Sequence, residues 1–300
     1  MKIFITGGSG LLGQYLNLEF AKKNEILTAY HSNVGNCNLF NSVQLNLIDK
    51  NSVAETLKSF KPQVVIHTAA ITSPIIKNNI SPGLYFDLNV IATKNLAEIC
   101  RKINSRMIYI STDLVYAGYR GQMLDEKSKL IPASIYAETK LMGEVKIQET
   151  FNNYLILRTA LLYGFGLNHS KNHFSEIFNN LKEEKPVKLF FDQFRTPISL
   201  QEASRTIMKL CEMGISGEII NLGGNERLSR FELGEKLCDI CGFNKNLIEK
   251  ISMKDLKNYP QVEDVSLNTD KLKSFGIKTI SVEDSIREII ISRNQAEQSY

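Results

Sequence analysis

The sequence has no long apolar run and no leader-like start. In its 300 residues, no apolar stretch approaches the length of a membrane-spanning helix, so we expect no membrane association. Met1 and Lys2 lead directly into Ile3–Thr6 and then glycines, without the apolar core or the cleavage site of a signal peptide. These absences predict a cytoplasmic protein.

The charges are not gathered into a basic stripe. The 36 basic and 32 acidic residues give a formal net charge of +4 and are dispersed along the chain. A nucleic-acid-binding surface needs clustered Lys and Arg, so we predict no nucleic-acid partner.

A metal-site or redox motif is also missing. Of five cysteines, only Cys238 and Cys241 form a C-x-x-C, and it lies in an expected helix without a second pair or a flanking Gly-Pro turn. His169 and His173 are four positions apart but lack the carboxylate of an H-E-x-x-H pattern. We therefore predict reduced, structural thiols and no metal site.

What is present is the composition and periodicity of a globular α/β protein. The chain is 43% hydrophobic and 23% charged, and it is long enough for one composite domain or two closely packed ones. Short apolar runs alternate with helical patterns: strands at 2–6, 26–30, 64–68 and 107–111, and helices at 11–23, 52–60 and 84–103. This alternation predicts repeated βαβ units, and hence a doubly wound parallel sheet with helices on both faces.

The second half is less regular. We expect a helix that carries Tyr136 and Lys140, a strand at 154–158, a hairpin-like pair at 187–191 and 195–199, a helix at 202–213 and another sheet strand at 218–222. From residue 229 onward, a smaller lobe is expected. It is closed by a helix at 282–292, with a frayed tail from residue 294.

The segment Thr6-Gly-Gly-Ser-Gly-Leu-Leu-Gly13 joins the first expected strand directly to the first helix. In this context Gly7 permits a tight turn, Gly10 lets the backbone approach a pyrophosphate, and Gly13 allows close helix–strand packing. The motif predicts a Rossmann-type dinucleotide site that includes Leu11 and Leu12. Residues 1–165, completed by about 200–224, are then the NAD(P)-binding domain, and 166–199 with 225–300 are the substrate-binding lobe.

The end of the second expected strand reads Ala29-Tyr-His-Ser-Asn33. An NAD-preferring site usually has an Asp or Glu here to bind the ribose 2′-hydroxyl, and this chain has none. A 2′-phosphate would meet no repulsion and could accept hydrogen bonds from Ser32, Asn33 or His31. The sequence favours NADPH and leaves NADH as the alternative.

Two further segments carry hydroxyl groups that suit carbonyl chemistry. Tyr136 and Lys140 are four positions apart and share one helix face, a spacing that also arises by chance in many proteins. Thr112 and Asp113 follow the strand at 107–111, at the sheet edge where ligands bind. The alternative for Thr112 and Asp113 is a simple turn cap.

At this point the chain resembles a known family. T-G-x-x-G-x-x-G, "HTAAIT" at 67–72, "STDLVY" at 111–116 and "YAETK" at 136–140 resemble an extended short-chain dehydrogenase/reductase. "LRTALLYG" at 157–164, "DQFRTP" at 192–197 and "VSLNTDKLKSFG" at 265–276 are similar to the dTDP-4-dehydrorhamnose reductase family and its sugar-nucleotide relatives. The similarity covers essentially the whole chain.

The resemblance implies roles for residues that match the family pattern. Tyr136 matches the proton donor to the carbonyl, Lys140 the lysine that holds the nicotinamide ribose and lowers the tyrosine pKa, and Thr112 the hydroxyl that hydrogen-bonds the same carbonyl. Asp113 matches a sugar contact. The family resemblance also implies cofactor contacts at Ala69, Ala70, Ile71, Asn46 and Leu47. At Asn46 the family commonly has an aspartate.

Asn89 lies in the expected helix beyond the "HTAAIT" loop. It either positions a water molecule or backbone group or is an ordinary buried asparagine.

Departures from related families narrow the reaction. Leu114 stands where dehydratases carry a catalytic glutamate, and no cysteine of the epimerase-reductase type occurs between Ser111 and Gly118. Simple reduction is therefore favoured. Residues 73–77 lack the acidic side chains that the reductase family usually has after this loop, so the sugar and its nucleotide stay open.

Arg195 in "DQFRTP" is a candidate for bidentate contact with a diphosphate, and an exposed surface arginine is the competing interpretation. The substrate-binding residues we predict are Thr112, Asp113 and Arg195.

The predicted function is an oxidoreductase of carbohydrate biosynthesis: NADPH-dependent reduction of the 4-keto group of a nucleotide-activated deoxysugar, with dTDP-4-dehydro-rhamnose the leading candidate. One alternative is an NAD-dependent nucleotide-sugar 4-epimerase, which would use the same Tyr, Lys and Thr. Another is a non-catalytic subunit resembling the regulatory subunit of methionine adenosyltransferase. A homodimer is compatible with the sequence, which contains no stretch that demonstrates one.

Overall fold

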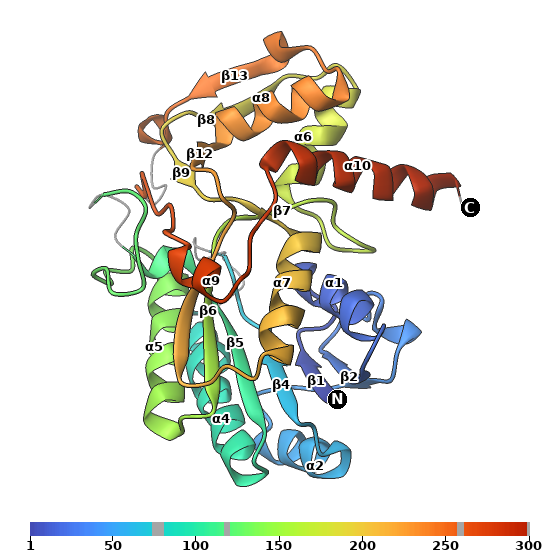
Figure 1. Ribbon diagram of the computed structural model, residues 1–300, viewed down its shortest axis with the longest axis vertical. Coiled ribbons are helices and arrows are strands. Elements are labelled where there is room, and N and C mark those ends of the chain that lie inside the picture. The colour runs from blue at the N-terminus through green and yellow to red at the C-terminus, as the bar shows by residue number, and fades with distance from the viewer. Residues whose placement is uncertain (74–80, 117–120, 257–260, 299–300) are drawn as a thin grey trace.

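The centre of the protein is a parallel sheet. The computed structural model describes residues 1–73, 81–116, 121–256 and 261–298. Within these residues, seven strands form one sheet in the order β11-β6-β5-β4-β1-β2-β3, and every neighbouring pair is parallel (Figure 1). The strands are β1 (Lys2–Thr6), β2 (Glu25–Tyr30), β3 (Ser42–Gln44), β4 (Val64–His67), β5 (Arg106–Thr112), β6 (Tyr154–Thr159) and β11 (Glu218–Leu222). The predicted doubly wound α/β fold is confirmed.

Helices cover both faces of the sheet because successive strand residues point to opposite sides. Ile3 and Ile5 pack in the core with one helix layer, while Phe4 packs with the other. The first layer is α1 (Leu11–Phe20) and α7 (Leu200–Glu212); the second is α2 (Lys50–Phe60), α4 (Thr93–Lys102) and α5 (Ile135–Thr150). Both faces of the strands are buried, which is why they read as apolar runs.

The helix expected at 84–103 is divided. It consists of α3 (Pro82–Phe86), a π-helix (Asp87–Ala92) and α4. A π-helical turn shifts the register of the side chains that follow it and is common beside functional sites. Periodicity could not show it, because the apolar pattern continues across the insertion. Residues 74–77, part of the segment that differs from the reductase family, lie outside the described residues.

The smaller region consists of short strands and helices at the top of Figure 1. Its strands are β7 (Leu162–Tyr163), β8 (Val187–Phe190), β9 (Phe194–Arg195), β10 (Ile198–Ser199), β12 (Leu228–Ser229) and β13 (Ile248–Ile251). Its helices are α6 (His173–Lys182), α8 (Arg230–Cys241) and α10 (Val282–Gln298), whereas α9 (Asp270–Ser274) packs against β11 of the sheet. Short 3-10 turns occur at Cys37–Leu39, Asp113–Val115, Lys245–Leu247 and Met253–Asp255.

Two predictions for this region are wrong. The hairpin expected from 187–199 does not form, because β8 pairs in parallel with β13, β9 pairs antiparallel with β12, and β10 pairs in parallel with β7. The tail expected to fray from residue 294 continues as helix α10 to Gln298. In both cases the partner or the continuation lies outside the short window that a local pattern covers.

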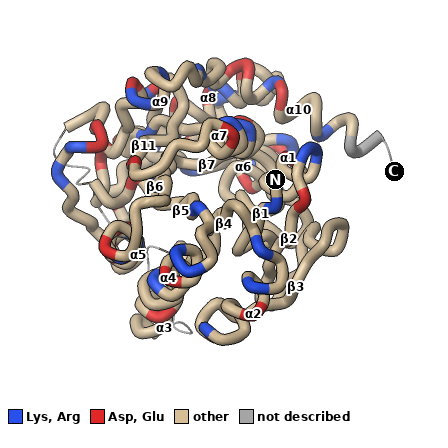
Figure 2. The backbone as a smooth tube through the Cα atoms, turned by 60° about the horizontal axis from the view of Figure 1, so that its bottom comes forward, with Lys and Arg blue, Asp and Glu red and all other residues tan. Residues whose placement is uncertain are grey.

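Charged residues of both signs alternate over the surface helices, as the dispersed charge of the sequence suggested (Figure 2). No helix among the described residues has both the length and the apolar character needed to cross a membrane. In the same ranges, no group of three or more His, Cys, Asp or Glu side chains could hold a metal ion.

Candidate active site

The glycine segment forms a tight turn between β1 and α1. Gly7 has a φ of +65°, and a Cβ there would lie 2.7 Å from Thr68 Oγ1. A Cβ on Gly13 would overlap the carbonyl oxygen of Gly7, so only glycine lets the helix start this close to the strand. Gly8, which sequence reasoning did not single out, is equally confined because a Cβ would overlap Thr28 Oγ1. The tight turn and the close helix–strand packing that the motif predicted are present.

A cavity of about 920 Å³ opens at the carboxyl ends of the sheet strands. This is the edge where ligands of open α/β sheets bind. Most of the predicted site residues line it: Gly7, Gly10, Leu11, Leu12, Gly13, Asn46, Leu47, Ala69, Ala70, Ile71, Thr112, Asp113, Tyr136, Lys140 and Arg195. Residues far apart in the sequence are thus brought to one place.

Ser32 and Asn33 are the exceptions. The side of the cavity at the end of β2 is formed by Tyr30 and His31, whereas Ser32 and Asn33 are exposed beyond it. The carbonyl oxygen of His31 accepts a hydrogen bond from Gln44 Nε2 at 2.8 Å. Of the three candidates for a 2′-phosphate contact, His31 is therefore the one at the cavity.

Asn89 fixes the loop that was expected to lie against a cofactor. Its Oδ1 accepts from the backbone N–H of Ile71 at 3.0 Å, and its Nδ2 donates to the carbonyl oxygen of Ile71 at 3.1 Å. The same amide donates to Thr139 Oγ1 on α5 at 3.0 Å. Of the two interpretations offered by the sequence, the structure supports a positioning role: the π-helix ties the loop to α5.

Tyr136 and Lys140 lie one turn apart near the start of α5, whose N-cap is Ser134. Burial raises the pKa of Tyr136 above its ordinary value of 10.0; the Thr112 side chain lowers it and the Asp113 carboxylate raises it. Burial lowers the pKa of Lys140 from 10.5 to about 7, against the opposing charge of Glu144. Desolvation is the largest cause of the pKa shift at both groups. The lowering of the Tyr136 pKa by Lys140, which the family resemblance implies, stays a prediction.

Thr112 forms the turn cap and also lies at the cavity, so its proposed contact with a substrate stays a prediction. Its Oγ1 accepts from the backbone N–H of Leu114 at 3.2 Å, which caps the turn after β5. The same hydroxyl donates to Asp113 Oδ1 at 3.2 Å and lies on the cavity surface. The cap therefore fixes the hydroxyl beside Tyr136.

Asp113 faces Arg195, with 3.5 Å between Oδ2 and Nε. Arg195 is only 5% exposed, so its interpretation as a surface arginine is wrong. Burial raises the pKa of Asp113, and the charges of Arg195 and Arg230 oppose the rise. Within the described part of the chain, Asp113 Oδ2 has no hydrogen-bond partner. The pair presents a buried carboxylate and a guanidinium to the same cavity.

Arg230 is a cavity residue that sequence reasoning missed. It is the first residue of α8, and its Nε donates to Gln193 Oε1 at 2.8 Å. It lines both the main cavity and an adjoining one of about 690 Å³ between α6 and α8. The capping box of Ser229 and Glu232 marks the start of this helix, but no motif marks the direction of the arginine.

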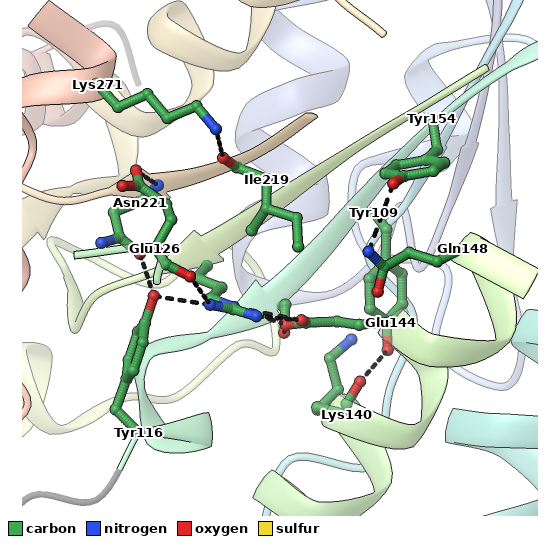
Figure 3. A network of polar contacts seen from close by, with 12 residues as sticks. Tyr109, Tyr116, Glu126, Lys140, Glu144, Gln148, Tyr154, Ile219, Asn221 and Lys271 are labelled. Atoms are coloured by element: carbon green, nitrogen blue, oxygen red, sulfur yellow. Dashed lines mark hydrogen bonds and ion pairs between the residues drawn. The ribbon is translucent and has the colours of Figure 1, made fainter. Parts of the chain in front are cut away.

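A buried ion pair supports α5 from behind. Glu144 and Arg158 are 1% and 2% exposed, with 2.8 Å between Oε2 and a terminal guanidinium nitrogen. The guanidinium also donates to Tyr116 Oη at 2.9 Å, and that hydroxyl donates to Asn221 Oδ1 at 2.8 Å (Figure 3). Helix α5 is thereby joined to β6 and β11 by polar side-chain contacts.

Comparison with known proteins agrees with this architecture. Methionine adenosyltransferase 2 subunit beta of Xenopus laevis is 28% identical over 289 residues, which cover 92% of this chain and 83% of that protein. The dTDP-4-dehydrorhamnose reductase of Aggregatibacter actinomycetemcomitans is 25% identical over 272 residues, or 88% and 84% of the two chains.

A solved structure shows the same fold. The dTDP-4-dehydrorhamnose reductase of Bacillus anthracis, in complex with NADP, superposes with a TM-score of 0.84 at 23% identity, covering 97% of this chain and 99% of that one. The RmlD substrate binding domain family matches residues 1–294. The resemblance found in the sequence is confirmed, and the chain belongs to the RmlD substrate binding domain family.

Proposed function

We propose that the protein reduces the 4-keto group of a nucleotide-activated deoxysugar with NADPH, dTDP-4-dehydro-rhamnose being the leading candidate. The observation that carries this proposal is a single cavity that joins a glycine cradle to Thr112, Tyr136 and Lys140. Beyond these groups the same cavity reaches Arg195 and Arg230. A cofactor site, a proton donor and an anion site are therefore continuous.

The chain's own residues supply binding, orientation and a proton. The glycine turn and the N-terminus of α1 accept a pyrophosphate, and the loop held by Asn89 lies beside it. When bound, a nicotinamide cofactor supplies the hydride. Tyr136 gives its phenolic proton to the carbonyl oxygen, and Thr112 donates a hydrogen bond to the same atom. A raised tyrosine pKa keeps the donor protonated until the reaction.

The substrate end of the cavity suits a diphosphate. Arg195 and Arg230 bring two guanidinium groups to it, and charge-assisted, bidentate hydrogen bonds to phosphate are their strongest interaction. Leu114 lines the same space and has no acid–base group, which favours reduction over dehydration. We assign residues 1–165 and 200–224 to cofactor binding, and 166–199 with 225–300 to the sugar nucleotide.

NADPH is the proposed cofactor because no carboxylate stands at the end of β2. His31, at the cavity surface, is the group placed to meet a 2′-phosphate. A Michaelis constant for NADPH far above that for NADH would contradict this assignment.

The test is NADPH oxidation, followed at its absorbance band, with a panel of nucleotide-linked 4-keto sugars generated in situ. We expect oxidation with one sugar, and none with Tyr136→Phe, which removes the proton donor while leaving cofactor binding intact. A Tyr136→Phe variant that keeps most of the rate would contradict the mechanism. Purification with tightly bound NAD, and no net NADPH consumption, would support the 4-epimerase instead.

A second function is favoured by the similarity to methionine adenosyltransferase 2 subunit beta. In this alternative, the chain binds a cofactor and serves a catalytic partner. It predicts tight NADPH binding without oxidation of any sugar, and a changed rate of methionine adenosyltransferase on addition of the protein. The presence of Thr112, Tyr136 and Lys140 in one cavity is the reason we place reduction first.

A further inference from the structure

The ammonium group of Lys140 lies over the face of a buried aromatic ring. Its Nζ is 3.8 Å from the centroid of the Tyr109 ring (Figure 3). Tyr109 is fully buried on β5, and Lys140 is 2% exposed. A cation so close to a ring face is attracted by the ring quadrupole, and the attraction is largest where water is excluded. The ring therefore takes the place of water on one side of the ammonium.

The ring is held firmly in place. It packs in the core between the sheet and helices α2, α4 and α5, with the His67 ring centroid 5.5 Å from its own. Its hydroxyl donates to the carbonyl oxygen of Lys140 at 3.4 Å. Gly143 lets α5 approach this closely, since a Cβ there would lie 2.5 Å from Tyr109 Oη. The lysine side chain thus rests on a fixed surface.

Three other titratable groups lie near Lys140, and none of them covers the side of the ammonium that the Tyr109 ring faces. Glu144, one turn along α5, is engaged by Arg158 of β6 and by the Ser111 hydroxyl of β5. Tyr136 precedes Lys140 by one turn on α5, and His67 faces it from β4. Burial lowers the pKa of His67 to about 3, so this imidazole is neutral at physiological pH.

Tyr109 itself adds no charge. Burial, and next the charge of Glu144, raises its pKa well above the ordinary value of 10.0. The group facing the ammonium is therefore a neutral ring.

We propose that Tyr109 is a positioning residue for the reaction, which holds the ammonium of Lys140 in place through its ring face. This inference rests on the proposed function, with Lys140 in the role that the family resemblance implies, holding the nicotinamide ribose beside Tyr136. Loss of the ring removes a group that favours the charged amine, so the cationic form disappears at lower pH.

The test compares Tyr109→Phe, which keeps the ring face, with Tyr109→Leu, which removes it. For Tyr109→Leu we expect the basic limb of the kcat/KM profile to move to lower pH by about one unit, the scale of a desolvated cation–π contact. For Tyr109→Phe the basic limb stays in place. If the basic limb of the kcat/KM profile lies at the same pH in both variants, the proposal is overturned. A purely structural role would change the yield and the unfolding temperature but would not move this limb.

A second set of variants covers failure of Tyr109→Leu to fold. Phenylalanine analogues of increasing ring fluorination at position 109 keep the shape and weaken the ring face. The basic limb should move stepwise with fluorination, and an unchanged limb would contradict the proposal.

A readout independent of turnover separates the two proposals. The carbon-13 resonance of Lys140 Cε, assigned with Lys140→Met, should titrate near the pKa of about 7 in the wild type and lower in the ring-free or fluorinated variants. Identical midpoints would overturn the role of Tyr109. If no sugar is reduced but the midpoints differ, the proposed function fails while the contact stands.

Discussion

Arg195 is a buried residue that lines the cavity and forms an ion pair with Asp113. Arg195→Ala removes the proposed diphosphate contact, and charge-assisted hydrogen bonds of this kind are worth about 1.5–3 kcal/mol. We expect the KM for the nucleotide-sugar to rise about 10- to 100-fold while NADPH affinity stays unchanged. The control is Arg287→Ala, which removes an exposed arginine of α10. Unchanged binding of the nucleotide-sugar to Arg195→Ala would rule out the contact.

His67 makes the free energy of unfolding depend on pH. It is fully buried between Thr6 Oγ1 at 2.7 Å and Thr93 Oγ1 at 3.0 Å. Burial, and then the charge of Lys140, lowers its pKa from 6.5 to about 3. The unfolded chain therefore binds a proton here below pH 6.5 that the folded protein binds only below about pH 3. The neutral His67 therefore contributes its full stabilisation above pH 6.5, and this stabilisation is lost as the pH falls towards about 3.

The measurement is the free energy of unfolding in urea at several pH values between these two limits. Relative to the wild type, His67→Gln should lack a slope of about 1.4 kcal/mol per pH unit. His169→Gln, which replaces an exposed histidine, should follow the wild type. Parallel curves for the wild type and His67→Gln would refute the assignment.

Helix α5 is the element on which the site depends most. A Cβ at Gly143 would lie 2.5 Å from Tyr109 Oη and 2.9 Å from the carbonyl oxygen of Asn89, and the backbone atom has no free rotation to yield. Gly143→Ala should therefore destabilise the protein by about 1–3 kcal/mol in urea unfolding. Gly83→Ala is the matched control, because its nearest contact would be Ser81 Oγ at 3.8 Å. Equal stability of the two variants would disprove this view of α5.

Elements of the sheet were predictable because buried parallel strands carry continuous apolar runs, as Val64–His67 does. Strand β3 was missed because three residues form no readable pattern. In the smaller region the strands have two to four residues, and β8 pairs with β13, which lies about sixty positions later in the sequence. Such pairings depend on tertiary contacts, which local periodicity does not contain.

At the scale of the whole molecule, the residues at the cofactor end of the cavity could be predicted from motifs, whereas those at the substrate end could be predicted only in part. Gly7, Thr112, Tyr136 and Lys140 carry motifs whose spacing reflects the turn, strand end and helix that hold them. Arg230 has no such motif, because its direction is set by the packing of α8 against the rest of the smaller region. The cavity lies where the two regions meet, so neither alone would complete it.

The measurement that tests the central claim most directly is transfer of deuterium from NADPH, labelled at nicotinamide C4, to the 4-keto sugar. The account predicts one deuterium at C4 of the product sugar, detected by mass spectrometry and NMR, and none with Tyr136→Phe. A product whose configuration has changed without deuterium, or no product from any sugar despite tight NADPH binding, would contradict it.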